Sequence, residues 1–426
     1  MTLNRRKFLT LLGSTATAGL MGFPAISHSA YRARVIVVGG GYGGATAAKY
    51  LRLADPRIEV ILIEKKQKFI SCALSNEVIA GERDLESLSF GYEPLTAFYG
   101  VNVVHDEVTG IDANKRLVQT RSGQQHGYDR LIVAPGVSFR WDAIEGYDEA
   151  AAQLLPHAWD AGEQTLLLHQ QLKDMPDGGK VYIIAPPNPY KCPPGPYERA
   201  ALIAHYLTQQ GKTRSKIIIL DSKDRFDKQA LFEQGWEQHY PGMISWVPAA
   251  EDGKVLRVDA QKRALYTEFE VHKADVINVI PPQKASYIAE QAGLTDGLGW
   301  CPVNQQTFES AKRDNVHVIG DACMAGSMPK AGYAANSQAK VCAAAISALI
   351  DGAKPPLPSY VNTCYSILAP DHGISVTSVY TLEDGEIIDV EGAGGVSPLN
   401  ASAWERKMEA TYARSWFDNI TADIFG

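Results

Sequence analysis

Val35-Ile-Val-Val-Gly39-Gly-Gly41-Tyr-Gly-Gly44 is the most informative stretch of the chain, because it places a glycine-rich turn directly after an apolar strand. An expected helix over Ala45–Leu53 and a second apolar strand over Ile58–Ile63 follow, and Glu64 closes the unit. In a dinucleotide-binding unit of this order, the pyrophosphate lies at the helix N-terminus and the acid holds a ribose hydroxyl. The sequence therefore predicts one intact dinucleotide site, formed by Gly39, Gly41, Tyr42, Gly43, Gly44, Glu64 and Lys65.

The chain repeats this layout once, with prolines in place of the glycine turn. A strand over Lys180–Ala185 is followed by the loop Pro186-Pro-Asn-Pro-Tyr-Lys-Cys192-Pro-Pro-Gly-Pro-Tyr197, an expected helix over Glu198–Gln209 and a strand over Lys216–Asp221. Proline lacks an N–H group and fixes φ, so this loop offers no row of backbone amides to a pyrophosphate. We therefore expect no NAD(P)H at the second unit, and the electrons must leave by another route.

Three further segments favour FAD over NAD at the first site. Tyr128-Asp-Arg-Leu-Ile-Val-Ala134-Pro-Gly136 is similar to the strand and turn that flavoproteins with two dinucleotide domains carry after a small inserted sheet. Val316-His-Val-Ile-Gly320-Asp321 ends in an acid suited to a ribityl hydroxyl, and Met328-Pro-Lys330-Ala-Gly332-Tyr333 leads into a helix whose N-terminus would stabilise reduced flavin. Each segment alone is equally compatible with a buried strand or a helix cap, whereas the ordered set indicates FAD.

These units predict an α/β protein with two Rossmann-like domains of the glutathione reductase type and a smaller α+β C-terminal interface domain. The expected boundaries are 30–150 and 285–354 for the two parts of the FAD-binding domain, 151–284 for the second Rossmann-like domain, and 355–426 for the interface domain. The tail after about Pro355 is rich in Tyr, Ser, Val and Gly, which favours a mostly β module.

The N-terminus predicts export. Asn4-Arg5-Arg6-Lys7-Phe8-Leu9 precedes a mildly apolar stretch, and small residues up to Ser29 suit a signal peptidase, so 1–29 resembles a twin-arginine signal and the mature protein is expected in the periplasm. The alternative is a membrane-anchoring N-terminal helix, although glycines and Pro24 interrupt the apolar run. Removing three basic residues and no acid takes the formal net charge from −7 to −10, which argues against nucleic acid as a partner. No other stretch approaches the roughly twenty apolar residues of a membrane span, and we predict no metal site.

Six cysteines, Cys72, Cys192, Cys301, Cys323, Cys342 and Cys364, would lie in an oxidising compartment, where disulfides persist. Their pairing does not follow from their number. Cys192 is the most informative, because it sits in the proline loop that replaces the second glycine turn. Cys342 lies in an expected helix core and Cys323 reads as a small buried residue.

The chain resembles the flavoprotein subunit of flavocytochrome c sulfide dehydrogenase, a relative of sulfide:quinone reductases. The resemblance rests on Gly39–Tyr50, Cys72–Val78, Cys192–Arg199, Pro329–Tyr333, Asn362–Ala369 and Ser415–Ile420. It implies FAD tethered through its 8α-methyl group to Cys72, and a redox-active disulfide between Cys192 and Cys364. It also implies a c-type cytochrome subunit that carries the haem, with Trp416 lying between flavin and haem. The alternative for Trp416 is core packing, and Cys323 and Cys342 depart from the expected cysteine pattern.

Sulfide chemistry is consistent with these residues. Hydrosulfide attacks a disulfide sulfur readily, giving a persulfide on one cysteine and a thiolate on the other, which can pass electrons to flavin. Glu198 is placed to take the proton, or it merely complements the helix dipole. Lys191 either lowers the pKa of a thiol or attracts hydrosulfide, or it is a solvated surface charge.

The acceptor remains a choice between a c-type cytochrome and a quinone, and the absence of an expected lipid-binding C-terminal helix disfavours the quinone. A non-catalytic flavin subunit that relays electrons is a further alternative. The intact Cys192 and Cys364 argue against it. A pyridine-nucleotide disulfide reductase is disfavoured, because the second glycine turn is gone and no closely spaced cysteine pair follows the first helix.

Overall fold

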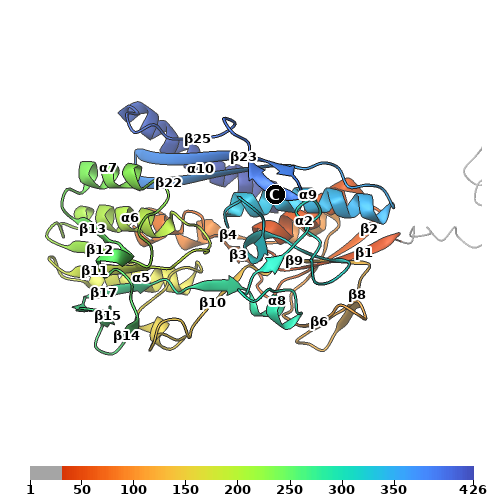
Figure 1. Ribbon diagram of the computed structural model, residues 1–426, viewed down its shortest axis with the longest axis horizontal. Coiled ribbons are helices and arrows are strands. Elements are labelled where there is room, and N and C mark those ends of the chain that lie inside the picture. Colours follow the sequence, from red (N-terminus) through yellow and green to blue (C-terminus); the bar gives the residue numbers. More distant parts are fainter. Residues whose placement is uncertain (1–30) are drawn as a thin grey trace, which may run out of the picture.

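The computed structural model describes residues 31–426 and confirms the α/β class (Figure 1). The expected twin-arginine segment lies outside the described residues. The first sheet is entirely parallel, with the strand order β20-β9-β1-β2-β5. Its strands are β1 (Ala33–Val38), β2 (Ile58–Ile63), β5 (Asn102–Val104), β9 (Arg130–Val133) and β20 (Val316–Val318). Val35, Ile36 and Val37 are fully buried, which explains why β1 reads as an unbroken apolar run.

Two long helices pack on this sheet and on each other. They are α2 (Tyr42–Ala54) and α9 (Gly332–Ile350), and α4 (Glu93–Tyr99) lies beside α2. Strand β20 and helix α9 come from late in the chain, so the first unit is assembled from two separate segments. Between them the chain crosses to the second unit and returns through an antiparallel pair, β10 (Val137–Phe139) and β18 (Gln283–Ala285).

The second unit has a parallel sheet with the order β13-β12-β11-β17. The strands are β11 (Lys180–Ala185), β12 (Lys216–Asp221), β13 (Ile244–Val247) and β17 (Val276–Val279), and the helices are α5 (Glu163–Asp174), α6 (Gly195–Gln209) and α7 (Gln229–His239). Each of the two parallel sheets presents the carboxyl ends of its strands to the loops that carry the expected site residues, which is where α/β folds bind ligands.

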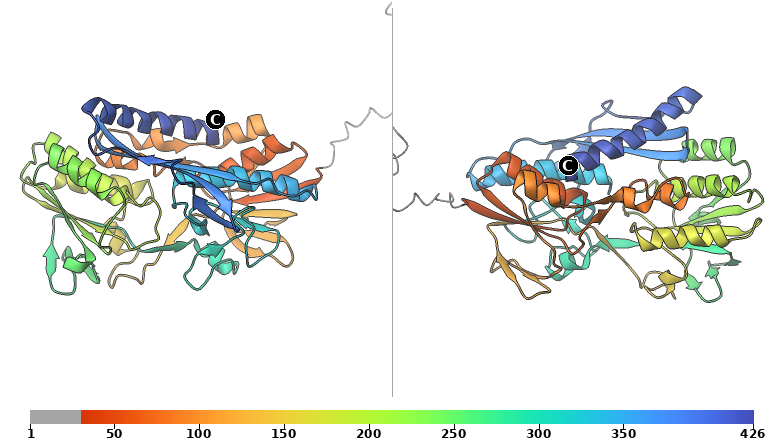
Figure 2. Two further views of the ribbon diagram at one scale, coloured as in Figure 1. Left: turned by 45° about the horizontal axis from the view of Figure 1, so that its top comes forward. Right: turned by 180° about the vertical axis from the view of Figure 1, so that it is seen from behind.

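The C-terminal module lies along both units (Figures 1 and 2). It consists of β22 (Ser359–Ala369), β23 (His372–Glu383), β24 (Glu386–Asp389), β25 (Gly395–Val396) and α10 (Ala403–Phe425). Strand β22 contacts α9 of the first unit and both α6 and α7 of the second. The module therefore holds the two Rossmann-like units against each other.

The expectation of an α+β C-terminal domain is confirmed, but the β-rich composition of the tail did not place its helix, α10, which takes 23 residues from Ala403 to Phe425. Ser402 caps this helix by accepting from the backbone N–H of Glu405, whose carboxylate accepts from the N–H of Ser402. Ala410, Ala413 and Phe417 are buried at spacings of three and four residues, which is the pattern of a helix with one packed face.

The remaining elements are short. They are β3 (Phe69–Ile70), α3 (Ser75–Ile79), β4 (Ser89–Phe90), β6 (Val108–Asp112), β7 (Leu117–Thr120), β8 (Gln125–Gly127), β14 (Arg257–Asp259), β15 (Ala264–Tyr266), β16 (Val271–Lys273), α8 (Tyr287–Gln291), β19 (Cys301–Pro302) and β21 (Cys323–Met324). Within residues 31–426, no helix is both long and apolar enough to cross a bilayer.

Candidate active site

The glycine turn after β1 has the geometry that a pyrophosphate site requires. Gly39 has φ of +96°, and a Cβ there would lie 2.4 Å from the carbonyl oxygen of Ala134. A Cβ on Gly44 would lie 1.8 Å from the carbonyl oxygen of Gly39. No side chain caps the N-terminus of α2 and its first turn carries no acid, so its first N–H groups are available to an anion.

Glu64 directly follows β2, and its side chain contacts this turn. Its carboxylate accepts from the backbone N–H of Gly40 at 2.7 Å and of Lys66 at 2.9 Å. These bonds fix the carboxylate at the turn, where a ribose hydroxyl would be held. Lys65 pairs instead with Glu107 at 3.5 Å and is half exposed.

The expected segments with Gly320-Asp321 and with Met328–Tyr333 lie together just before the N-terminus of α9. The carboxylate oxygen Oδ1 of Asp321 is buried and has no hydrogen-bond partner among the described residues. Burial raises the pKa of Asp321, while Lys191 and Lys330 oppose that rise. Lys330 donates to the carbonyl oxygens of Asp321 at 2.8 Å and Cys323 at 2.9 Å. An unpartnered buried acceptor of this kind suits a ribityl hydroxyl.

The start of α9 packs on the glycine turn. A Cβ on Gly332 would lie 3.0 Å from the ring of Tyr42, whose hydroxyl is 2.9 Å from the hydroxyl of Ser71. Gly136 and Gly320 both have positive φ, and α9 has no side-chain cap. The residues therefore fit FAD: α2 would receive the pyrophosphate, Glu64 and Asp321 would accept from hydroxyls, and the N–H groups at the start of α9 would be available to the flavin.

Cys72, between β3 and α3, faces a partly buried lysine. Lys191 Nζ lies 3.5 Å from Cys72 Sγ and 2.9 Å from a carboxylate oxygen of Asp160. Cys72 Sγ is also 3.5 Å from the carbonyl oxygen of Trp159. The sequence suggested Lys191 as a neighbour of Cys192, but its side chain contacts the sulfur of Cys72.

Cys192 and Cys364 reach the same region from different units. Cys192, in the proline loop, has φ of +55°, and its N–H donates to the carbonyl oxygen of Lys330 at 2.8 Å. Cys364 lies in the middle of β22, where Asn362 Nδ2 is 3.3 Å from its sulfur. Both are free thiols in this structure, as are the other four cysteines. The disulfide between them stays a prediction.

The surroundings of these thiols disfavour their ionisation. Cys192 exposes part of its surface to solvent, yet the dense packing around it raises the pKa of its thiol, and the charges of Glu198, Cys364 and Cys72 add to that rise. Burial also raises the pKa of Cys364, while Lys228 opposes it. Because Cys72, Cys364 and Glu198 are all close enough to influence the pKa of Cys192, these four residues lie in one region.

Glu198, in the first turn of α6, links the two cysteine segments. One carboxylate oxygen accepts from the N–H of Ile367 on β22 at 2.8 Å, and the other accepts from Asn76 Nδ2 at 2.7 Å. Burial raises the pKa of Glu198, although these two hydrogen bonds oppose the rise. A carboxyl group with a raised pKa beside two thiols is suited to proton transfer.

Two charged residues of this region escaped the sequence analysis. Arg199 is 2% exposed and donates only to neutral oxygens, those of Asn76, His157, Ala158 and Asn278. Burial lowers its pKa to about 10. Lys228, before α7, donates to Ser366 Oγ at 3.1 Å, and none of its contacts within residues 31–426 is a salt bridge. Arg199 directly follows Glu198 in the sequence, but its hydrogen-bond partners and the position of Lys228 depend on distant segments, so neither role follows from a local pattern.

The second dinucleotide position is filled by protein side chains. Asp221, the acid that ends β12, is fully buried and accepts from Tyr197 Oη at 2.5 Å, Lys223 Nζ at 2.6 Å and Trp246 Nε1 at 3.0 Å. The ring of Phe226 stacks on that of Tyr197 at 3.6 Å between centroids. The carboxylate that would hold a nicotinamide dinucleotide's ribose is therefore already engaged.

Trp416 lies on α10 and stacks on Tyr333 at the start of α9, with ring centroids 6.4 Å apart and an interplanar angle of 17°. Tyr365 of β22 packs on it from another side at 6.3 Å. Its indole nitrogen is buried and has no hydrogen-bond partner within the described part of the chain. Trp416 thus joins the C-terminal module to the expected flavin end of α9.

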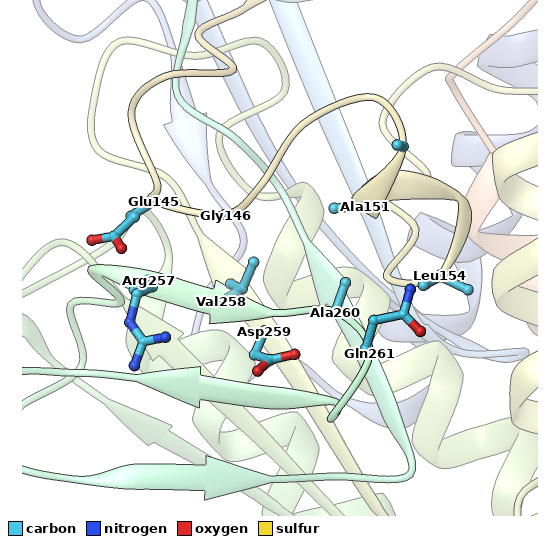
Figure 3. Close-up of a pocket in the computed structure, with 10 residues that line it drawn as sticks. Glu145, Gly146, Ala151, Leu154, Arg257, Val258, Asp259, Ala260 and Gln261 are labelled. Carbon is cyan, nitrogen blue, oxygen red and sulfur yellow. The ribbon is translucent and has the colours of Figure 1, made fainter.

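A separate hollow of about 420 Å³ lies between the 145–154 segment and β14 (Figure 3). Figure 3 shows Glu145, Arg257 and Asp259 around it. None of the expected site residues lines this hollow, so it has no part in the chemistry considered above.

The chain matches three family models. The central model of the sulfide dehydrogenase [flavocytochrome c] flavoprotein chain matches residues 165–281, and the flavocytochrome c sulphide dehydrogenase flavin-binding model matches 356–425. The pyridine nucleotide-disulphide oxidoreductase model matches 33–180. The two sulfide dehydrogenase models thus cover the proline loop with Cys192 and the strand with Cys364.

Similar sequences come from two groups of proteins. The sulfide dehydrogenase [flavocytochrome c] flavoprotein chain of Chlorobaculum thiosulfatiphilum is 60% identical over 45 residues, which are 11% of this chain and 94% of that sequence. The mitochondrial sulfide:quinone oxidoreductase of Mus musculus is 25% identical over 303 residues, which are 67% of this chain and 65% of that protein. The match with the Dictyostelium discoideum enzyme also covers 65% of its length, so the chain spans slightly less than two thirds of these two relatives.

Solved structures share the fold. The sulfide:quinone oxidoreductase of Aquifex aeolicus superposes with a TM-score of 0.72 at 17% identity, over 92% of this chain and 91% of that one. A putidaredoxin reductase in complex with putidaredoxin superposes with a TM-score of 0.65 at 17% identity, over 91% and 93%. At such low identity these matches establish the architecture alone.

Proposed function

The chain belongs to the family of the flavoprotein chains of flavocytochrome c sulfide dehydrogenase, and from this premise we propose that it oxidises hydrogen sulfide to sulfur or polysulfide. One observation carries the proposal. Glu198 lies on α6, six residues after Cys192. It accepts a hydrogen bond from the N–H of Ile367, which lies on β22 three residues after Cys364. A single carboxyl group therefore ties together the segments of the two cysteines that sulfide chemistry needs.

The proposed sulfur step uses these three residues. Hydrosulfide attacks the disulfide of Cys192 and Cys364, a new S–S bond forms as the old one breaks, and the electron pair leaves on the other cysteine as a thiolate. Glu198, whose pKa is raised by burial, takes up the proton. FAD would supply the two-electron oxidant, which can be reoxidised one electron at a time. As the two electrons leave, the thiolate sulfur bonds to the outer sulfur of the persulfide, and a further hydrosulfide displaces that sulfur as polysulfide and restores the disulfide.

We propose further that the flavin is FAD held through its 8α carbon by Cys72, and that a c-type cytochrome subunit carrying the haem takes the electrons. The stacked pair of Trp416 and Tyr333 connects the C-terminal module with the start of α9 and supports an exit on that side. The twin-arginine pattern at Arg5 and Arg6 supports folding before export and a periplasmic location.

The first test adds sulfide to the purified flavoprotein without oxygen while the flavin absorbance is recorded. Bleaching by sulfide is expected for the wild type and for C342A, whose cysteine is buried in α9 away from the site. C192S and C364S should each slow bleaching by at least about a thousandfold. Bleaching that survives both substitutions would exclude the disulfide route, and an unchanged wild-type spectrum would exclude sulfide as the substrate.

The acceptor is tested in the same preparation. After sulfide reduction, a c-type cytochrome should reoxidise the flavin, whereas a water-soluble quinone should do so more slowly. The opposite order would favour the quinone route, which the names of the relatives from Mus musculus and Aquifex aeolicus suggest for those proteins.

A further inference from the structure

The contact between Lys191 and Cys72 is not used by the proposed sulfur chemistry. Lys191 is fixed at both ends, because its N–H donates to Gln283 Oε1 at 3.0 Å and its ammonium group bonds Asp160 at 2.9 Å. Its side chain is 15% exposed, while that of Asp160 is 58% exposed. The ammonium group therefore lies between a solvent-facing carboxylate and the sulfur of Cys72, 3.5 Å away.

Lys191 keeps its proton in this position. Burial alone would lower its pKa, but Cys72, Asp160 and Asp321 outweigh burial and raise the pKa above the ordinary value. The residue thus acts as a fixed cation and not as a base. A cation beside a cysteine sulfur favours the thiolate, which is the nucleophilic form.

We propose that Lys191 activates Cys72 for covalent attachment to the flavin. The inference rests on the proposed tether and assigns the residue that makes Cys72 reactive. In the attachment, Cys72 forms an S–C bond to the 8α carbon as one C–H bond of the methyl group breaks. The thiol proton, the methyl proton and the electron pair pass to the flavin, which is thereby reduced, and dioxygen or the enzyme's own acceptor reoxidises it.

Lys191 contacts Cys72 directly and acts on the sulfide-step cysteine Cys192 only through its charge. Its direct contacts are with Cys72, Asp160 and Gln283, while its positive charge opposes the rise in the pKa of the Cys192 thiol. The cation that lies beside the strand of Cys364 is Lys228 instead. Loss of Lys191 should therefore affect attachment first, and leave FAD bound without a covalent bond.

The experiment measures attachment directly. Full-length protein from riboflavin-starved cells is mixed with FAD in air, samples are precipitated with acid over time, and flavin on the Cys72 peptide is quantified by mass spectrometry. K191M should attach flavin at least tenfold more slowly than wild type, K191R within threefold of it, and D160N at an intermediate rate. Flavin that acid releases from K191M reports bound but untethered FAD.

K340M is the matched control, because Lys340 forms an ion pair of the same 2.9 Å with Asp423 on another part of the fold. It should attach flavin as fast as wild type. The inference is wrong if K191M attaches within about twofold of wild type, or if K340M slows attachment as much. If K191M does not fold, the test uses D160N, which removes the charge of the carboxylate paired with Lys191. Flavin attachment in D160N at the wild-type rate would then overturn the inference. If wild-type protein releases all its flavin, the tether and this inference both fail, while sulfide bleaching is judged by its own assay.

Discussion

The ammonium group of Lys228 lies 3.1 Å from the hydroxyl oxygen of Ser366, two residues along the same strand from Cys364. Alternate residues of a strand share a face, so the positive charge lies beside the face that carries the Cys364 sulfur. Burial raises the pKa of this thiol and Lys228 opposes the rise. Glu198 and Asp227 act against Lys228, and Asn362 acts with it by donating to the sulfur.

Replacing Lys228 by methionine should therefore make Cys364 a weaker nucleophile. In dithiothreitol-reduced protein, K228M should slow alkylation of Cys364 near neutral pH by roughly tenfold and move the midpoint of its pH dependence upward. K228R should restore most of the rate. K254M removes an exposed lysine and serves as the control. An unchanged midpoint in K228M would show that Lys228 has no influence on the thiol.

The glycine turn predicts a pair of variants with opposite outcomes. A Cβ on Gly44 would lie 1.8 Å from the carbonyl oxygen of Gly39, whereas a Cβ on Gly297 meets nothing within 4 Å. G44A should lose bound flavin and cost more than about 3 kcal/mol of unfolding free energy, because the strand and helix must move apart. G297A should retain both. Flavin content after desalting and chemical denaturation measure the two effects, and equal behaviour of the variants would contradict this account of the turn.

Acid should destabilise the fold through buried histidines. Burial lowers the pKa of His157, His317 and His372 to about 4, below the ordinary value of 6.5. Between these values the unfolded chain binds protons that the folded protein does not, so stability is full above about pH 6.5 and falls as the pH drops toward 4. Unfolding free energies measured between pH 7 and 4.5 should show this slope.

One of these histidines offers a direct comparison. His372 Nδ1 lies 2.8 Å from His239 Nε2, at the junction of β23 with the end of α7. H372Q should flatten the pH dependence by about a third if the three histidines act alike, and H105Q, at an exposed position, should leave it unchanged. A slope that is the same in H372Q would assign the acid sensitivity to other groups.

The filled second dinucleotide position predicts inertness to nicotinamide cofactors. Because Asp221 already accepts three side-chain donors, millimolar NADH should leave the flavin oxidised under conditions in which sulfide bleaches it. D221N should lower stability by about 2–4 kcal/mol, since it leaves Lys223 without its buried charge partner. It should still not respond to NADH. Bleaching of the wild type by NADH would show that a nucleotide site survives.

Local patterns were sufficient for most of the sheet strands. Ile58–Ile63, Lys180–Ala185 and Lys216–Asp221 begin and end where the apolar runs indicate, because buried parallel strands are apolar on both faces. Helix α6 begins at Gly195 and not at Glu198, since Pro196 is compatible with a first helical turn, whose N–H groups need no intrahelical partner. Helix α10 was missed because the composition of the whole tail outweighed the periodic spacing of its last residues.

The site residues likewise fall into those that the sequence predicts and those that only tertiary contacts reveal. The glycine turn, Glu64 and Asp321 follow from sequence because each stands at the end of a strand, and the resemblance pointed to Cys72, Cys192 and Cys364. Lys228, Arg199 and the turn of Lys191 toward Cys72 did not follow. They depend on contacts between segments that lie more than a hundred residues apart, which hydrophobic periodicity does not encode.

The buried guanidinium group of Arg199 carries a positive charge that no salt bridge balances among residues 31–426. Its guanidinium group is surrounded by neutral oxygens, and no carboxylate within residues 31–426 forms a salt bridge with it. Burial lowers its pKa, while negative charge on Cys192, Cys72 or Glu198 opposes that fall. Arg199 therefore stabilises any anion that forms at this site, so electrostatic compensation is already built into the scaffold when a thiolate develops during sulfide oxidation.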